Sequence, residues 1–459
     1  MIDAFRLKGW IRESHLPQWA YVRTATMVGR ARAHWGGNLG ALRTLLAAWR
    51  RAILTTFPPS GVAVVDEIVK RTCYDQAELL PVSENQLLAE FLDTEEAREI
   101  REKFGRFPLA HRLRLRLPRE NDNPERQGNL VVLKRHNPER GERGVILLKY
   151  SEAFLWFAAL YDLSEIASRY LVVLEPCWSG YQDWRLLLYL GRDLDVVVCA
   201  PYPPDFHFIE SLDTNLVPTR LGAGDWVDPQ TFRPKEGNGR SFDLVMVAAW
   251  HPFKRHEVLF HTLARLKREG YRELRVALVG YPSYWPCRKI ESLMHAHGVQ
   301  DQCVIFESIP HSQVAEIVAD SAAFVLLSKH EGANKALYES LFCDTPVIVS
   351  RGHRGVNPDH VPEEAGVRFR PGELAEAIRW VLENPDRFEP RKWALSVTGW
   401  PRATEQLDQV LAKVAARRRE PWQVPIVAKK NAPNLFYAEE GKYQDFREEY
   451  EGLERYFRK

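Results

Sequence analysis

The fold class is decided by residues 323–350, which read AFVLLSKHEGANKALYESLFCDTPVIVS. An apolar run from Ala323 to Ser328 leads through a polar loop into helical text at Asn334–Phe342, and a second apolar run covers Pro346–Ser350. Short, continuous apolar and β-branched runs predict strands that are buried on both faces. The stretch therefore predicts a strand, a helix and a neighbouring parallel strand, the repeating unit of a doubly wound sheet.

The same alternation continues on both sides of this stretch. The C-terminal series has expected strands at Leu244–Ala248, Arg275–Gly280, Cys303–Phe306, Ala323–Ser328 and Pro346–Ser350, and expected helices at Lys254–Glu269, Arg288–His297, Ser312–Asp320, Asn334–Phe342 and Gly372–Leu382. An earlier series has expected strands at Val145–Lys149, Tyr170–Glu175 and Val196–Ala200, and helical text at Ser151–Ser168. Strict alternation predicts parallel sheets covered by helices, so we expect two Rossmann-like α/β domains with a crossover near Leu221–Pro234.

Four parts of the chain follow from these patterns. Residues 1–117 form a basic, mainly helical N-terminal extension, in which Ser83–Phe104 reads as one helix because Ser83 and Gln86 have capping-box spacing. Residues 128–225 are expected to form the N-terminal Rossmann-like domain. Its start lies within a polar boundary at Pro118–Gly144, which is interrupted by the apolar run Leu130–Leu133. Residues 226–400 form the C-terminal Rossmann-like domain, and residues 401–459 form a helical tail folded back on the domains.

Composition excludes several classes of protein. The chain has 459 residues with 63 Lys and Arg against 61 Asp and Glu, which disfavours a dedicated nucleic-acid binder. Its six cysteines are scattered without CxxC spacing, which disfavours a zinc ribbon or a disulfide framework and favours a reducing cytoplasm. The longest apolar stretch, Ala153–Tyr161, has nine residues, about half of what a bilayer crossing needs. We therefore expect a cytoplasmic protein without a membrane span or signal peptide.

Residues 1–60 are locally basic. They carry nine cationic side chains against two anionic ones, with tryptophans at positions 10, 19, 35 and 49. This mixture suits peripheral contact with anionic lipid at the inner face of a membrane. It equally suits a helical subdomain whose aromatic side chains pack on the protein while its arginines face water.

Two carboxylates flank the helix start that follows the strand at 323–328. Glu331 precedes the helix, and Glu339 lies inside it eight positions later. Gly332 and Ala333 are small, so backbone N–H groups at the helix start can approach an anionic or hydroxyl-rich ligand. Such a pair suits a nucleotide-sugar, with one carboxylate on sugar hydroxyls and the other on the ribose diol. The competing interpretation is an ordinary helix start with a solvent-facing glutamate.

Two cations follow the first strand of the same domain. Lys254 and Arg255 open the next helix, where they suit a diphosphate because lysine is a compact charge and arginine a bidentate fork. The helix dipole disfavours cations at this end unless an anion is also present, which favours a ligand over a plain surface pair.

Together these motifs resemble the retaining nucleotide-sugar glycosyltransferases of family 4, which have the GT-B fold of two facing Rossmann-like domains. The resemblance rests on the Glu331-x7-Glu339 spacing with its Glu-Gly start and on the strand at 345–349. It is supported by Lys254 and by the crossover text at 226–234, and it covers about residues 215–385. In that family an arginine commonly precedes the lysine, but Ala248 and Ala249 stand there. A glycine pair often follows the first strand, but the chain has Tyr-Ser-Glu at 150–152.

The resemblance implies a role for each matching residue. Lys254 and Glu331 are the catalytic candidates, because the lysine would bind the diphosphate and the glutamate the donor sugar. The remaining donor-binding candidates are Arg255, Gly332, Ala333, Asn334, Lys335 and Glu339. On the acceptor side, the candidates are His207, Ser179 and Gly180. A lone histidine is often structural, however, and the loop at 176–181 reads equally well as a buried aromatic turn.

The function that follows is retaining transfer of a sugar from a nucleotide-diphosphate sugar to a hydroxyl acceptor, which is a glycan, a lipid-linked glycan or a small molecule. No cofactor is expected, and no metal, because no DxD-like cluster stands in a suitable loop. Two other interpretations remain open. One is a degenerate, non-catalytic sugar-nucleotide-binding or scaffold protein, and the other is a sugar phosphorylase of related fold.

Overall fold

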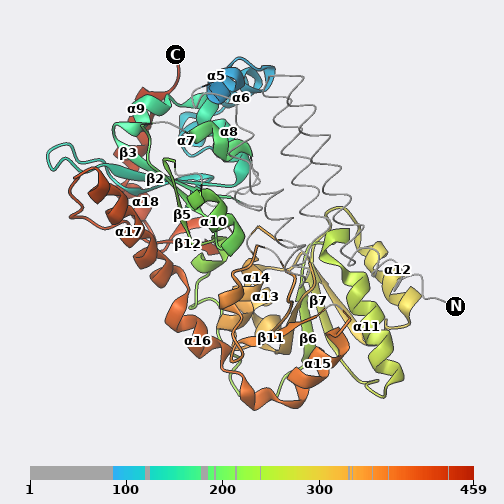
Figure 1. Cartoon of the computed structure of the whole chain (residues 1–459). Coiled ribbons are helices and arrows are strands. Elements are labelled where there is room, and N and C mark those ends of the chain that lie inside the picture. Colours follow the sequence, from blue (N-terminus) through green and yellow to red (C-terminus); the bar gives the residue numbers. More distant parts are fainter. Residues whose placement is uncertain are drawn as a thin grey trace. The chain divides into compact units, whose positions relative to one another are not determined.

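The computed structural model describes residues 86–118, 125–176, 184–190, 193–211, 214–237, 239–328, 331–332, 334–353, 355–370, 372–432 and 434–459. Two compact units divide the chain: Met1–Ala223 together with Ala403–Lys459, and Gly224–Arg402 (Figure 1). The basic segment 1–60 lies outside the described residues. Within the described ranges, no helix has both the length and the hydropathy to cross a membrane.

The first unit contains a five-stranded sheet in the order β1-β2-β3-β4-β5. Its strands are β1 (Leu130–Lys134), β2 (Gly144–Lys149), β3 (Tyr170–Glu175), β4 (Val196–Cys199) and β5 (Leu216–Thr219). Strands β2 to β5 pair in parallel, and β1 pairs antiparallel with β2 at the edge. Every residue of β1 to β4 is buried, as expected for a sheet covered on both faces. The three strands expected here are present, whereas β5 was missed and the apolar run inside the polar boundary is β1.

Two of the helices expected in this unit are each broken into two. Residues 83–104 were expected as one helix, but the structure has α5 (Gln86–Leu92) and α6 (Glu95–Gly105). Thr94 has an extended backbone and its hydroxyl accepts a hydrogen bond from the Ala97 N–H, so it caps a new helix. Asp162 does the same between α8 (Ser151–Leu160) and α9 (Leu163–Ala167). The apolar periodicity runs through both breaks, which is why it predicted single helices.

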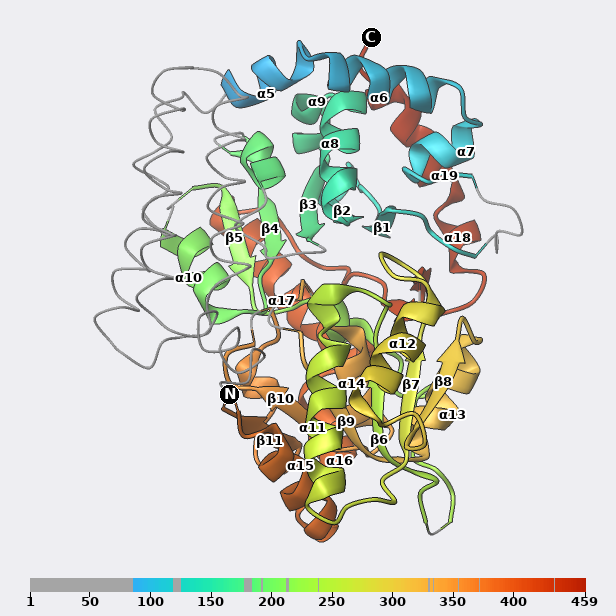
Figure 2. The same ribbon diagram turned by 90° about the vertical axis from the view of Figure 1, so that its right-hand side faces the viewer.

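From Ala403 onward, the C-terminal segment is part of the first unit. It contains α17 (Trp400–Arg417), β12 (Lys429–Ala432), β13 (Asn434–Tyr437), α18 (Lys442–Asp445) and α19 (Arg447–Gly452). The sequence predicted a helical tail, and the structure adds a two-stranded antiparallel sheet to it. Figure 2 shows α19 beside α7 (Leu109–Leu113), and α6 running along α8.

This segment covers the edge of the sheet at β1. The Val132 N–H donates to the Tyr450 hydroxyl at 3.0 Å, and the Tyr437 hydroxyl donates to the Val132 carbonyl at 2.7 Å. The Val427 N–H donates to the Leu133 carbonyl at 2.8 Å. An open strand edge pairs readily with other chains, so these bonds also remove an aggregation site.

A buried ion pair holds the same segment at the carboxyl end of β3. The Lys429 Nζ atom lies 2.8 Å from Glu175 Oε2, and neither residue is more than 1% exposed. Lys149 Nζ lies 3.8 Å from the other carboxylate oxygen. Burial lowers the pKa of Lys429 to about 8, although Glu175 acts in the opposite direction.

The second unit contains a six-stranded parallel sheet in the order β11-β10-β9-β6-β7-β8. Its strands are β6 (Phe242–Val247), β7 (Val276–Gly280), β8 (Cys303–Glu307), β9 (Ser321–Leu326), β10 (Val347–Ser350) and β11 (Gly366–Phe369). The five strands expected here are present, and β11 was missed. Because the chain builds outward from β6 in one direction and from β9 in the other, the strand order reverses between these two strands.

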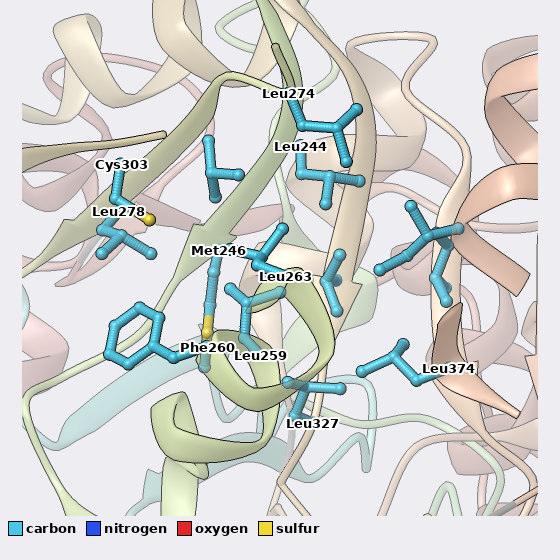
Figure 3. Close-up of a cluster of buried hydrophobic side chains, with 14 of the residues drawn as sticks. Leu244, Met246, Leu259, Phe260, Leu263, Leu274, Leu278, Cys303, Leu327 and Leu374 are labelled. Carbon is cyan, nitrogen blue, oxygen red and sulfur yellow. The ribbon is translucent and has the colours of Figure 1, made fainter. Parts of the chain in front are cut away.

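Helices cover both faces of this sheet. One face carries α11 (His256–Arg268), α12 (Cys287–His297) and α15 (Leu374–Glu383), and the other carries α13 (His311–Ala319), α14 (Lys335–Phe342) and α16 (Pro390–Val397). Alternation along β6 sends Leu244 and Met246 to the α11 face and Val245 to the α14 face. Figure 3 shows Leu244, Met246 and Leu278 of the sheet with Leu259, Phe260 and Leu263 of α11.

The covered edge of the first sheet generates a stability prediction. Replacing Tyr450 with phenylalanine leaves the buried Val132 N–H without its acceptor, so the free energy of unfolding should fall by about 1 to 3 kcal/mol. Urea denaturation followed by circular dichroism measures this change. Tyr443→Phe is the control, because it removes a hydroxyl from a half-buried ring nearby and should change stability by less than about 0.5 kcal/mol. Equal effects of the two variants would contradict the role of Tyr450.

Candidate functional site

The candidate site lies in the second unit, at the carboxyl ends of β6 and β9. Ligands of open α/β sheets bind outside the carboxyl ends of the strands, where the strand order reverses. Lys254 lies in the loop after β6 and Glu331 in the loop after β9, so the two catalytic candidates lie on the two sides of the reversal.

Lys254 and Glu331 form an ion pair. The Lys254 Nζ atom lies 2.5 Å from Glu331 Oε1, and the two side chains are 14% and 10% exposed. Lys254 Nζ also lies 4.7 Å from the centre of the Phe253 ring. Residues 77 positions apart in the chain are therefore in direct contact. The pair places a cation and a hydrogen-bond acceptor side by side, as binding of a phosphate and a sugar hydroxyl requires.

The position of Lys254 is set by a short 3₁₀ turn. His251 has an extended backbone and its Nδ1 atom accepts a hydrogen bond from the Phe253 N–H at 3.2 Å, so the ring proton lies on Nε2. Burial, with Lys254 nearby, lowers the pKa of His251. Arg255 then has a left-handed backbone with φ of 63°, and its Nη1 atom donates to the Leu327 carbonyl at 3.4 Å. Helix α11 therefore begins at His256 and not at Lys254 as expected.

The loop after β10 packs against Glu331. Gly355 has φ of 94°, and a Cβ atom at this position would lie 1.5 Å from the Glu331 carbonyl oxygen. Only glycine fits such an approach between two backbones. Gly355 was not among the predicted site residues, although a glycine shortly after a predicted strand at this edge was a usable signal.

His353 lies in the same loop and was also missed. It is 7% exposed, and its Nε2 atom lies 3.5 Å from the Ser328 hydroxyl at the end of β9. Burial lowers the pKa of His353 to about 4, with Lys254 and Arg368 acting in the same direction and Glu331 against it. The site therefore contains a neutral imidazole next to the ion pair.

Glu339 is held on the second turn of α14. The Asn334 side chain caps this helix by accepting a hydrogen bond from the Leu337 N–H at 2.9 Å, so Asn334 positions the helix that carries Glu339. Glu339 is 4% exposed, and its Oε1 atom lies 3.2 Å from Nε2 of His311, the first residue of α13. The His311 ring packs edge-on against Phe232, with their centres 5.1 Å apart. His311 was missed, although it follows a predicted strand at the same edge.

The other donor-side candidates are partly described. Gly332 and Lys335 are half-buried at the start of α14, and Ala333 lies outside the described residues. Within the described part of the chain, no group of three or more His, Cys, Asp or Glu side chains comes together as a metal site would need.

The acceptor-side candidates belong to the first unit. His207 lies on α10 (Pro203–Ser211) with its side chain 69% exposed, and its Nδ1 atom lies 3.4 Å from Glu210 of the same helix. Ser179 and Gly180 lie outside the described residues. Tyr150, which stands where the resembled family often has glycine, has a left-handed backbone with φ of 73°. Tyr150 therefore adopts the positive φ that glycine usually provides at this position.

A family model matches most of the second unit. Residues 228–394, a little over a third of the chain, match the family model Glycosyl transferases group 1. The MMP α-(1→4)-mannosyltransferase of Mycolicibacterium hassiacum is 25% identical over 199 residues, 42% of this chain and 47% of that protein. This chain thus matches about half the length of its curated relative.

Two solved structures are among those similar to this chain. A sucrose-phosphate synthase from Thermosynechococcus elongatus has 18% identity and a TM-score of 0.48, covering 60% of this chain and 74% of its own. HepE from Anabaena, in complex with UDP and glucose, has 13% identity and a TM-score of 0.45. The match covers 58% of this chain and 77% of the HepE chain. The structure itself confirms the expected α/β fold of two Rossmann-like domains with parallel strands. The residues matched by the family model include both Lys254 and Glu339.

The buried histidines of this unit make its stability depend on pH. His256, at the start of α11, is fully buried against Trp250, and burial lowers its pKa to about 4, as it does for His353. An unfolded histidine titrates near 6.5, so between about pH 6.5 and 4 the unfolded chain binds more protons than the folded one. Stability is therefore complete above about pH 6.5 and falls as the pH drops, by at most about 3 kcal/mol for each histidine.

Replacing His353 with glutamine removes one of these two titrations. The loss of unfolding free energy between pH 7.5 and 4.5 should then be smaller than in the wild type, because the variant has one buried imidazole fewer to protonate. Urea denaturation at several pH values gives both slopes. His295→Gln, at an exposed position on α12, should keep the wild-type slope. A His353→Gln slope equal to that of the wild type would contradict the assignment.

Proposed function

We propose that this protein is a glycosyltransferase that moves a sugar from a nucleotide-diphosphate sugar to a hydroxyl acceptor with retention at the anomeric carbon. The observation that carries the proposal is the Lys254–Glu331 ion pair at the strand-order reversal. It is supported by the match of residues 228–394 to group 1 glycosyltransferases and by the similarity to a mannosyltransferase.

In this proposal the donor binds to both partners of the ion pair. The Lys254 ammonium has three N–H donors, so it can keep Glu331 while it binds a diphosphate oxygen. Glu331 then accepts hydrogen bonds from hydroxyls of the transferred sugar. Backbone N–H groups near Gly332 and Asn334, at the start of α14, add donors for the negative charge.

Glu339 binds the nucleoside in this proposal. Its carboxylate is buried on α14, and its contact with His311 leaves a second oxygen available to the ribose diol. Since α14 follows β9, Glu331 before the helix and Glu339 on its second turn suit two different parts of one donor molecule. Arg255, whose guanidinium reaches the Leu327 carbonyl, supports the loop that carries Lys254.

The chemistry proposed is front-face transfer. The bond between the anomeric carbon and the diphosphate oxygen breaks, and the acceptor oxygen bonds to the same face of that carbon. The acceptor hydroxyl proton passes to the departing diphosphate, so no protein nucleophile is required. Lys254 stabilises the charge that develops on the leaving group, which is the main electrostatic task in such a reaction.

The rival proposal is a sugar-nucleotide-binding protein that has lost catalysis. Ala248 and Ala249, where the resembled family often has arginine, favour it. The left-handed backbone of Tyr150 favours the enzyme, because the turn does not need the missing glycine. Lipid-linked acceptors and membrane contact through residues 1–60 remain predictions from the sequence.

One experiment tests the proposed function directly. The full-length protein is incubated with a panel of UDP-, GDP- and ADP-sugars, and nucleotide release and glycosylated products are followed by mass spectrometry. Transfer or slow donor hydrolysis with one donor supports the enzyme, whereas tight binding of a nucleotide-sugar without turnover supports the rival. Product formed only from inorganic phosphate and a glycoside would establish a phosphorylase.

Glu339→Ala should weaken binding of the preferred nucleoside diphosphate by about 1 to 3 kcal/mol, because the ribose hydroxyls would lose a buried acceptor. Isothermal titration calorimetry measures this affinity. Glu316→Ala, which removes an exposed carboxylate from α13, is the matched control and should bind as the wild type does. Unchanged affinity of Glu339→Ala for all three diphosphates would remove Glu339 from the site.

Lys254→Ala should reduce turnover about a hundredfold or more while the chain still folds, because one preorganised charge at the leaving group is lost. Steady-state kinetics with the donor that the wild type uses gives this ratio. The control is Lys267→Ala, which removes a half-buried lysine of α11 that pairs with Asp301. Turnover of Lys254→Ala within a few-fold of the wild type would refute the phosphate role.

A further inference from the structure

Two tyrosines stand out in the loop between β7 and α12. Tyr281 is 57% exposed and Tyr284 is 71% exposed, and among the described residues no other large hydrophobic side chain is as exposed as either. The loop begins directly after β7, at the same edge of the sheet as Lys254 and Glu331. Two such exposed aromatic side chains at the edge of the candidate site make this loop a candidate ligand-binding surface.

The loop is held rigidly in spite of this exposure. The Trp250 N–H donates to the Tyr281 carbonyl at 2.9 Å, and the Trp285 N–H donates to the Trp250 carbonyl at 2.8 Å. Trp250 itself is fully buried, and its indole N–H donates to Glu307 at 2.7 Å. The tyrosines are therefore presented on a fixed backbone, which reduces the entropy lost when a ligand packs on them.

A continuous row of rings joins this loop to the ion pair. The Tyr284 ring centre lies 5.3 Å from that of His251, which lies 4.5 Å from that of Phe253. Lys254 Nζ, the partner of Glu331, lies 4.7 Å from the Phe253 ring centre. A molecule whose reacting group lies at Glu331 could thus extend over the rings.

The row lies apart from the expected nucleoside position. Trp285, next to Tyr284, packs on the core under α11 and α12. Glu339 and His311 belong to α14 and α13, which cover the opposite face of the sheet. If the ribose binds Glu339, the nucleoside extends from the ion pair toward α13 and α14. The aromatic rings then lie on the opposite side of the ion pair, next to the transferred sugar.

We propose that Tyr284, His251 and Phe253, with Tyr281 exposed in the same loop, form a stacking platform for the pyranose rings of an oligosaccharide acceptor. This inference rests on the proposed function and names its acceptor class. A pyranose ring has an apolar C–H face and a rim of hydroxyls, so it packs on an aromatic face while it hydrogen-bonds to tyrosine hydroxyls and to the His251 N–H. The platform gives the C-terminal domain a share in acceptor binding, which the sequence analysis assigned to the N-terminal domain alone.

The test measures saccharide binding without a donor. The full-length protein is titrated by calorimetry with linear glucose- and mannose-based oligosaccharides of one to four units. Affinity should rise with length by about tenfold in at least one series, as expected for stacking on one or two rings. Tyr284→Ala should abolish this gain, and Tyr284→Phe should retain it to within about threefold because the ring remains. Trp380→Ala, which removes an exposed indole from α15, is the matched control and should bind as the wild type does.

The affinities of the protein for UDP, GDP and ADP show whether the rings bind the donor or the acceptor. Tyr284→Ala should leave them unchanged. A loss of nucleotide affinity in this variant would assign the rings to the donor and overturn the inference. So would the lack of any length-dependent saccharide binding, or an equal loss in Trp380→Ala. A failure of every nucleotide-sugar to support transfer would instead count against the proposed function, while the saccharide titrations would still report on Tyr284.

Discussion

The ion pair between Lys254 and Glu331 is the interaction on which the candidate site depends. Two half-buried charges are stable there because each neutralises the other, and removal of one partner would leave the other desolvated and unpaired. Their contact requires β6 and β9 to be neighbours, and it requires the loops after both strands to be held in place. The 3₁₀ turn before Arg255 positions the lysine, and the close approach of Gly355 holds the backbone of Glu331. Strand order, loop conformation and electrostatics thus meet at one contact.

Several side chains hold the elements of the candidate site in place. His353 is buried and stays neutral at physiological pH, so it fills space beside the pair without adding a charge. Asn334, which the sequence proposed as a donor-binding residue, caps the helix that carries Glu339. Its side chain therefore positions Glu339. The pinned backbone at Trp250 holds the loop of Tyr281 and Tyr284 in the same way. Preorganisation of this kind is what a site needs if binding is to cost little entropy.

The first unit depends on a different constraint, which is that its sheet has an edge strand to cover. The C-terminal segment meets that need with two tyrosines that hydrogen-bond to Val132, and with Lys429 paired to Glu175 at the carboxyl end of β3. A segment more than 250 residues from its partners in the sequence is therefore required for the N-terminal domain to be complete. Truncation of the last forty residues would open the edge and leave Glu175 with a single buried cation.

The sequence by itself predicted the two Rossmann-like domains and most of their strands, because apolar periodicity is a local property of the chain. From loop composition it also predicted Lys254, Glu331 and Glu339 as site residues. The structure places Lys254 and Glu331 in contact, while the roles of all three residues stay predictions. The sequence also indicated the edge of the sheet where these residues gather, since the carboxyl ends of parallel strands lie together. Only the tertiary structure decided the strand order, the pairing of Glu339 with His311, the roles of Gly355 and His353, and the place of the C-terminal segment. Each of these depends on contacts between residues far apart in the chain, and local patterns carry no information on which distant residue supplies the other side of a contact.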